Sequence, residues 1–161
     1  MKKRGQSIIE VVIAGALIST AIIACLTLVN YTQKQASFSR NLNTATTYNN
    51  QAADWIRSER ENLGWTTLVN KLENDSASRN SVTYCLNDLP TAQGQDFTSL
   101  TPGDCGTTYI STTIFSRMMT ADVSNLIANP NSGIVTIVIA TSWMDTSPRR
   151  TSFTMELSEW N

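Results

Sequence analysis

The chain has 161 residues, of which 41% are hydrophobic and 16% charged, and its formal net charge is −1. A charge this close to zero does not favour electrostatic binding of nucleic acid or of an acidic surface. The sequence contains no His, which removes the commonest general base and the commonest metal ligand. Beyond the N-terminal segment, about 100 residues remain, enough for one small globular domain.

The N-terminal segment is first basic and then apolar. Residues 2–4 are Lys, Lys and Arg, Gly5 follows, and an apolar run covers residues 11–29 after Glu10. Counted from Ile8, the run has about the twenty residues that a helix needs to cross a bilayer core. Basic residues ahead of an apolar segment predict a cytoplasmic N-terminus and export of everything after residue 29.

Glu10 is the unusual residue of this segment. A carboxylate so early in an apolar span costs roughly 2.5–3.5 kcal/mol even on lenient insertion scales. We therefore expect Glu10 to have a partner and a purpose.

These features together resemble the leader of type IV prepilins and pseudopilins: a short basic leader ending in Gly, four residues, a Glu and a long apolar helix. The resemblance implies a leader of residues 1–5, cleavage between Gly5 and Gln6 by a prepilin peptidase, and methylation of the new N-terminus at Gln6. Glu10, the fifth mature residue, would pair with the N-terminal amine of a neighbouring subunit. The sequence departs from the family at Gln6, where Phe or Met is usual, and in having no Pro in the apolar run.

The resemblance also implies a function. The chain would be a structural subunit of a type IV pilus or of a type II secretion-like pseudopilus, with no catalytic activity and no cofactor. Its partners would be other pilin subunits, the prepilin peptidase, the cytoplasmic membrane and the assembly machinery. The precursor would span the cytoplasmic membrane once and then join an extracellular or periplasmic filament. Residues 6–29 would pack against copies of themselves, with close approach at small residues; the assembly residues would be Glu10, Ile8, Ile9, Val12, Ala14 and Gly15.

Alternative interpretations remain for the same segment. Residues 22–25, Ile-Ile-Ala-Cys, fit a lipoprotein box, which would make Cys25 the lipid-modified N-terminus of a surface lipoprotein. A general signal peptide, or a plain single-span anchor carrying a ligand-binding module, would also begin with basic and then apolar residues.

Residues 30–63 are more polar but keep a helical period. Apolar side chains recur mostly at spacings of three and four, which is typical of one helix face; they are Tyr31, Phe38, Leu42, Ala45, Tyr48, Ala52, Trp55 and Ile56. No Pro or Gly occurs between Gly15 and Gly64, so we predict one helix from Gln6 to Asn62, ended by Gly64 in a left-handed cap. This continuity weighs against a lipoprotein, whose linker is more often rich in Gly and Ser.

The remainder, residues 64–161, is predicted to be a β-rich head. Residues 67–72 suggest one short helical turn and residues 73–81 a polar loop. Alternating β-branched residues predict strands, at residues 82–86, 109–118, 134–143 and 152–157. An antiparallel sheet with one apolar face, packed on the amphipathic half of the long helix, gives an α+β fold.

Two of the three cysteines, Cys85 and Cys105, flank a turn-rich stretch rich in Gly and Pro. An exported head would sit in an oxidising compartment, where a nearby pair forms a disulfide. A bridge that closes a loop of about twenty residues contributes roughly 3 kcal/mol in the chain-entropy treatment. Two unpaired buried thiols are the alternative. Cys25, inside the apolar run, is interpreted as a small apolar residue in lipid.

We find no catalytic or metal-binding pattern. Without His there is no Cys–His or Ser–His pair, and no phosphate-binding Gly-rich loop or zinc ligand set is present. Asp54, Glu59 and Glu61 are interpreted as solvated charges on the polar helix face, with Arg57 and Arg60 as possible ion-pair partners three or four residues away. Asp75 is interpreted as a loop residue.

Overall fold

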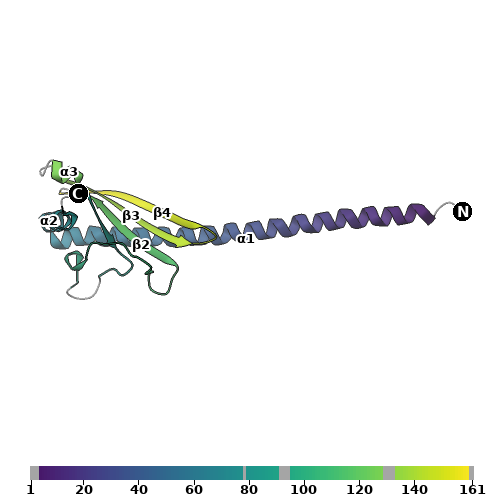
Figure 1. Ribbon diagram of the computed structural model, residues 1–161, viewed down its shortest axis with the longest axis horizontal. Coiled ribbons are helices and arrows are strands. Elements are labelled where there is room, and N and C mark those ends of the chain that lie inside the picture. Colours follow the sequence, from purple (N-terminus) through teal and green to yellow (C-terminus); the bar gives the residue numbers. More distant parts are fainter. Residues whose placement is uncertain (1–3, 78, 91–94, 129–132, 160–161) are drawn as a thin grey trace. The chain divides into compact units, whose positions relative to one another are not determined.

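The computed structural model describes residues 4–77, 79–90, 95–128 and 133–159. Its elements follow in the order helix α1 (Arg4–Leu63), helix α2 (Trp65–Ser76), strand β1 (Ser81–Cys85), 3-10 turn η1 (Phe97–Ser99), strand β2 (Phe115–Asp122), helix α3 (Ser124–Ala128), strand β3 (Ile134–Met144) and strand β4 (Pro148–Ser158) (Figure 1). The chain divides into two compact units, Met1–Asn41 and Leu42–Asn161, and α1 contributes to both.

The described residues of the first unit all belong to α1. The predicted helix from Gln6 to Asn62 is confirmed, with bounds at Arg4 and Leu63. After Gly15 the sequence offers neither Pro nor Gly to interrupt it, so each residue adds one backbone hydrogen bond to the helix.

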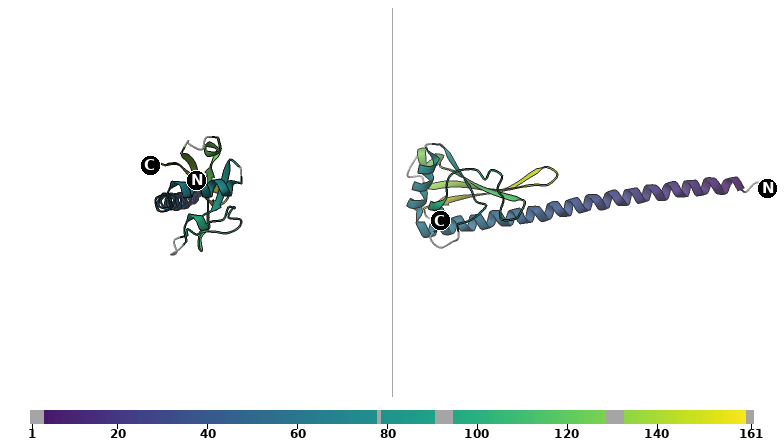
Figure 2. Two further views of the ribbon diagram at one scale, coloured as in Figure 1. Left: turned by 90° about the vertical axis from the view of Figure 1, so that its left-hand side faces the viewer. Right: turned by 60° about the horizontal axis from the view of Figure 1, so that its bottom comes forward.

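The second unit is α+β, as predicted. Four antiparallel strands lie in the order β1-β2-β3-β4, so that each strand neighbours the next one in sequence. β3 pairs with β4 from Ile134 opposite Ser158 to Met144 opposite Pro148. One face of this sheet covers the second part of α1, as two further views show (Figure 2).

The core forms between this sheet face and the helices. Alternation along the strands sends every second side chain inward, and the burial pattern of β2 and most of β3 follows that alternation. α1 contributes small residues that let its backbone approach the sheet closely. The core contains Ala52, Ala53, Ile56, Leu68, Leu72, Tyr84, Leu86, Phe97, Met119, Val135, Ile137, Ile139, Met155 and Leu157.

The segment after α1 differs from the prediction. Gly64 has φ 78 and ψ 153, which is outside the left-handed helical region, so it separates two helices and does not form the predicted cap. The expected single turn is the twelve-residue helix α2, whose Leu68 and Leu72 are buried one turn apart. Residues 73–76 looked like a loop because Asn, Asp and Ser favour turns, but burial of this helix face outweighs that preference.

The strand predicted for residues 109–118 begins later. β2 starts at Phe115, because the preceding residues form turns in which the Thr113 N–H donates to the Ile110 carbonyl. β1, β3 and β4 overlap the predicted strands, and residues 145–147 form the turn that joins β3 to β4.

Candidate assembly helix and disulfide-closed loop

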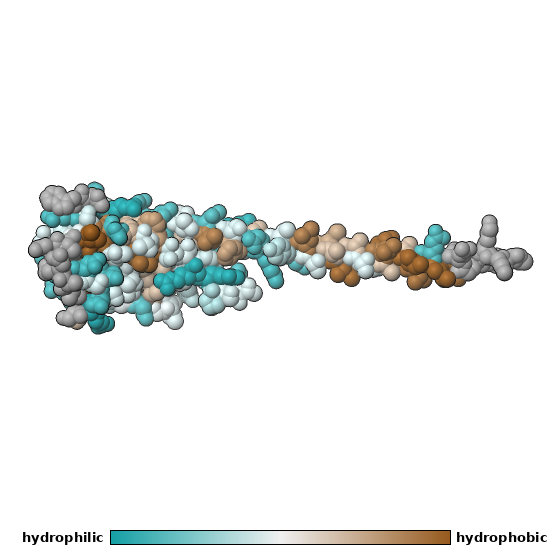
Figure 3. All heavy atoms as spheres, turned by 90° about the horizontal axis from the view of Figure 1, so that it is seen from above, coloured by the Kyte–Doolittle hydropathy of each residue, from teal (hydrophilic) through white to brown (hydrophobic). Residues whose placement is uncertain are grey.

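Residues 8–29 of α1 form an apolar surface that no other described residue covers. Every side chain in this stretch is exposed, and large hydrophobic residues such as Ile8, Ile9 and Val12 are 67%, 63% and 64% exposed. Figure 3 shows hydrophobic residues gathered along this part of the helix. By length and composition the helix is able to cross a membrane.

The polar side chains in this stretch fall into two classes. The hydroxyls of Ser19, Thr20 and Thr27 each donate to a backbone carbonyl three or four residues earlier, over 2.8 to 2.9 Å. They are therefore satisfied within the helix. Glu10 is different: among the described residues nothing bonds to its exposed carboxylate. It is also the only charged residue in residues 8–29.

The other predicted assembly residues lie on the same helix. Ile8, Val12 and Gly15 recur at i, i+4 and i+7 and so share one face, and Ala14 lies one turn after Glu10. A Cβ added at Gly15 would meet nothing within 4 Å, so the fold of this chain does not require glycine there.

The predicted cleavage site is only partly described. Gly5 and Gln6 lie in the first turns of α1, while residues 1–3 of the predicted leader and the side chains before Ile8 lie outside the described residues.

In its second half, α1 makes polar contacts with the sheet as well as apolar ones. Asn49 is 2% exposed; its Oδ1 accepts from Thr141 Oγ1 at 2.7 Å, and its Nδ2 donates to the Thr151 carbonyl at 3.3 Å. One buried amide thus connects α1 to both β3 and β4. Burial of such a group is tolerated only when it is hydrogen-bonded, as here.

The interpretation of Glu59 as a solvated charge is wrong. Its side chain is 7% exposed, and Oε2 accepts the N–H of Phe97 at 2.7 Å, which fastens η1 to α1. The partner, Phe97, lies 38 residues later in the sequence, and the periodicity of the helix does not indicate that Glu59 has such a partner. Of the two possible ion-pair partners, Arg57 forms a pair: its Nη1 lies 2.9 Å from Asp54 Oδ1, on the exposed side.

Asp75 is likewise not a loop residue. It lies in α2, where Oδ2 accepts from the Tyr84 hydroxyl at 2.7 Å and lies 2.8 Å from Lys71 Nζ. Burial raises the pKa of the Tyr84 phenol, and the neighbouring Asp75 carboxylate raises it further. The hydrogen bond between Tyr84 and Asp75 connects β1 to α2.

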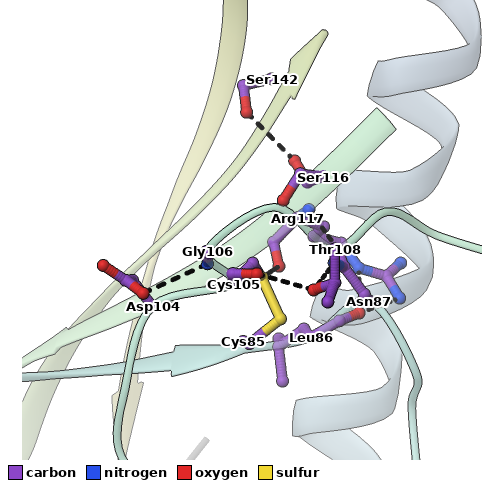
Figure 4. The surroundings of a disulfide bond; sticks show 10 residues. All are labelled: Cys85, Leu86, Asn87, Asp104, Cys105, Gly106, Thr108, Ser116, Arg117 and Ser142. Atoms are coloured by element: carbon purple, nitrogen blue, oxygen red, sulfur yellow. Dashed lines mark hydrogen bonds between the residues drawn. A yellow bond between two sulfur atoms is a disulfide. The ribbon is translucent and has the colours of Figure 1, made fainter. Parts of the chain in front are cut away.

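The predicted disulfide is present: Cys85, the last residue of β1, is bonded to Cys105 (Figure 4). Cys25 is a free, exposed thiol in α1.

Arg117 is the residue that sequence inspection missed. It is 2% exposed; Nε and Nη2 donate to the Leu86 carbonyl at 2.9 and 2.7 Å, and Nη1 donates to the Tyr48 carbonyl at 2.7 Å. Burial lowers its pKa to about 10, against smaller opposing effects of Tyr48 and Asp88. Its place between Phe115 and Met119 in an alternating strand was the available signal, because those two neighbours point inward.

Within the described residues no three His, Cys, Asp or Glu side chains are grouped as metal ligands. Comparison with known proteins gives no further guide to identity: no family model, no curated protein and no solved structure matches this chain.

Proposed function

We propose that this chain is a structural subunit of a type IV pilus or of a type II secretion-like pseudopilus. It is cleaved between Gly5 and Gln6, methylated at Gln6, and assembled through the first half of α1. The observation that carries the proposal is Glu10: a single charge without a partner among the described residues, on an exposed apolar helix segment, residues 8–29, whose hydroxyls are all satisfied.

A charge in an apolar setting needs a counter-charge, and no described residue supplies one to Glu10. Cleavage after Gly5 would create one, because the new α-amino group of Gln6 lies four residues before Glu10. Within one helix these groups are about 6 Å apart along the axis. When two copies insert in the same orientation, Glu10 of one copy pairs with the Gln6 amine of its neighbour. This pairing favours one axial offset between the two helices over all others.

Cohesion would come from the apolar surface of residues 8–29. In lipid, helices associate through close packing and through polar bonds, with small residues at the contact. Gly15 fits this role, because a Cβ added there would meet nothing within 4 Å and a neighbouring helix could approach there. In the filament, neighbouring helices would replace lipid around this segment.

Two features of the fold support this proposal over a lipoprotein. Modification at Cys25 would remove residues 8–24, the segment with the exposed apolar surface and Glu10. α1 also continues without a break through Cys25 to Leu63, whereas a lipid-anchored domain more often follows a flexible linker. We also propose a structural and not a catalytic role for the whole chain.

Substitution of Glu10 tests the proposal. Glu10→Ala should insert in the membrane and be cleaved, yet the sheared filament fraction should fall by an order of magnitude or more, since losing a paired intramembrane charge costs on the order of a few kcal/mol. Glu61→Ala, at an exposed position in the second half of α1, is the matched control and should assemble normally. Normal filament yield from Glu10→Ala would refute the pairing role.

Processing is separated from assembly by a second variant. Gly5→Leu should leave the full-length precursor in the membrane, because the resemblance places the cleaved bond directly after this residue. The masses of the two variants on a denaturing gel distinguish a failure of cleavage from a failure of assembly. A shortened mature chain from Gly5→Leu would contradict the cleavage assignment.

A further inference from the structure

The disulfide and Arg117 belong to one connected group of contacts. Leu86 directly follows Cys85; its carbonyl accepts both Nε and Nη2 of Arg117, and its N–H donates to the Arg117 carbonyl at 2.9 Å. Leu86, next to the first half-cystine, is thus hydrogen-bonded to Arg117 through both its carbonyl and its N–H.

The second half-cystine is connected to the same residue. The N–H of Arg117 donates to Asn87 Oδ1 at 2.7 Å, and Asn87 Nδ2 donates to Thr108 Oγ1 at 3.0 Å. The Thr108 hydroxyl in turn donates to the Cys105 carbonyl at 2.7 Å, and Cys105 Sγ lies 3.2 Å from the Arg117 carbonyl (Figure 4). Chain segments on both sides of the disulfide therefore converge on Arg117.

From this group Arg117 reaches α1. Nη1 donates to the Tyr48 carbonyl at 2.7 Å, and the guanidinium carbon lies 6.0 Å from the centre of the Tyr48 ring. The three side-chain bonds of this buried cation go to backbone carbonyls, which offset its desolvation only while they stay in place. Two of those three bonds end on Leu86, beside the disulfide.

We propose that the Cys85–Cys105 disulfide and α1 are coupled through Arg117 in a redox-sensitive way. The closed disulfide holds the Leu86 carbonyl where Arg117 needs it, and Arg117 holds α1 at Tyr48. Reduction releases Cys85, weakens the two bonds that Arg117 makes to the carbonyl of the adjacent Leu86 and loosens α1 around Tyr48. If the head is exported, the coupling is completed only outside the cytoplasm; this last clause alone rests on the proposed function.

The effect should be local, because the rest of the loop has other attachments. Glu59 holds the Phe97 N–H, and the Gly103 N–H donates to the Thr83 carbonyl at 2.8 Å. Neither contact involves the disulfide or Arg117. The part of α1 near Glu59 therefore serves as an internal control.

Hydrogen exchange of the full chain in detergent micelles, read by mass spectrometry, tests the coupling. Dithiothreitol opens the disulfide to two thiols and is itself oxidised to its cyclic disulfide, and Cys25→Ser in every sample prevents thiol exchange. On reduction, amide protection in residues 45–56 should fall by roughly tenfold, since a bond from a charged donor shifts a local opening equilibrium by about that factor. Protection in residues 57–63 should change less than about twofold.

Two variants in the same strand decide whether Arg117 carries the effect. Thr120→Val removes only the hydroxyl contact with Thr83 at 3.3 Å, and should leave the response to reduction intact. Arg117→Met should lower protection in residues 45–56 before reduction and abolish most of the further drop. If Arg117→Met does not fold, Arg117→Lys, which keeps the charge but not the fork of donors, should show a smaller drop than Thr120→Val.

Three results would overturn the proposal. One is unchanged protection of residues 45–56 when the unsubstituted disulfide is reduced. Another is an equal drop in the arginine variant and in Thr120→Val, which would mean that the disulfide acts by another route. The third is an equal loss of protection in residues 57–63, which would mean general loosening of the head.

Discussion

The two halves of α1 form one continuous helix, but their side chains need different surroundings. Residues 8–29 are apolar and exposed all round, while residues 42–63 bury one narrow stripe against a sheet and expose the rest. A helix that is hydrophobic on every side belongs in a membrane or among other helices, and one with a single stripe belongs on the surface of a small domain. The two halves therefore differ in where their partners come from.

The polar side chains make the same point. In the second half, Asn49 and Glu59 are buried and have partners on the sheet and on η1. In the first half, Glu10 has no partner among the described residues. The buried polar groups of the second half therefore have partners within the chain, whereas Glu10 in the first half has none among the described residues.

The largest expected contrast comes from removing the same side chain in each half. Ile56 is fully buried, so Ile56→Ala should reduce the free energy of unfolding of the head by about 2–5 kcal/mol. Ile18 is 60% exposed, and Ile18→Ala should leave head unfolding unchanged. Urea unfolding in detergent micelles, followed by Trp fluorescence, measures both. Equal effects would remove the distinction between the halves.

A smaller effect is expected at Glu59. Glu59→Ala leaves the Phe97 N–H without its acceptor inside the protein, a loss of about 1–3 kcal/mol. Glu61→Ala, exposed two residues later, should change stability by less than about 0.5 kcal/mol. The same unfolding assay compares them, and a neutral Glu59→Ala would restore the view of Glu59 as a solvated charge.

The smallest effect is expected for the exposed ion pair. Asp54 and Arg57 side chains are 75% and 49% exposed, and such pairs contribute about 0.3–0.5 kcal/mol. Asp54→Ala should therefore shift unfolding by no more than this, and the shift should vanish in high salt. A shift that persists at high salt would show that Asp54 has a role beyond the pair.

The elements that sequence reasoning predicted well are those with long or regular patterns. α1 has sixty residues without an internal breaker after Gly15, and β3 is a nearly continuous run of β-branched residues. The sequence of α2 was ambiguous, because its last turn contains Asn, Asp and Ser, which also favour loops. Its helix is stabilised by burying Leu68 and Leu72 in the core that it shares with the sheet.

The contacts that sequence reasoning missed are long-range and polar. Glu59 meets a residue 38 positions later, and Arg117 meets Tyr48, 69 positions away. No local pattern specifies such partners, since they depend on how the sheet and loop are placed on the helix. The disulfide was predictable because cysteines are few and two of them flank one loop.

Mass spectrometry of the N-terminus of the mature protein tests the central claim most directly. The account predicts a chain that begins at Gln6 with a methylated amine, the group that Glu10 of a neighbouring copy would bind. A mature chain that begins at an acylated Cys25, at Met1 or at any other residue would contradict it.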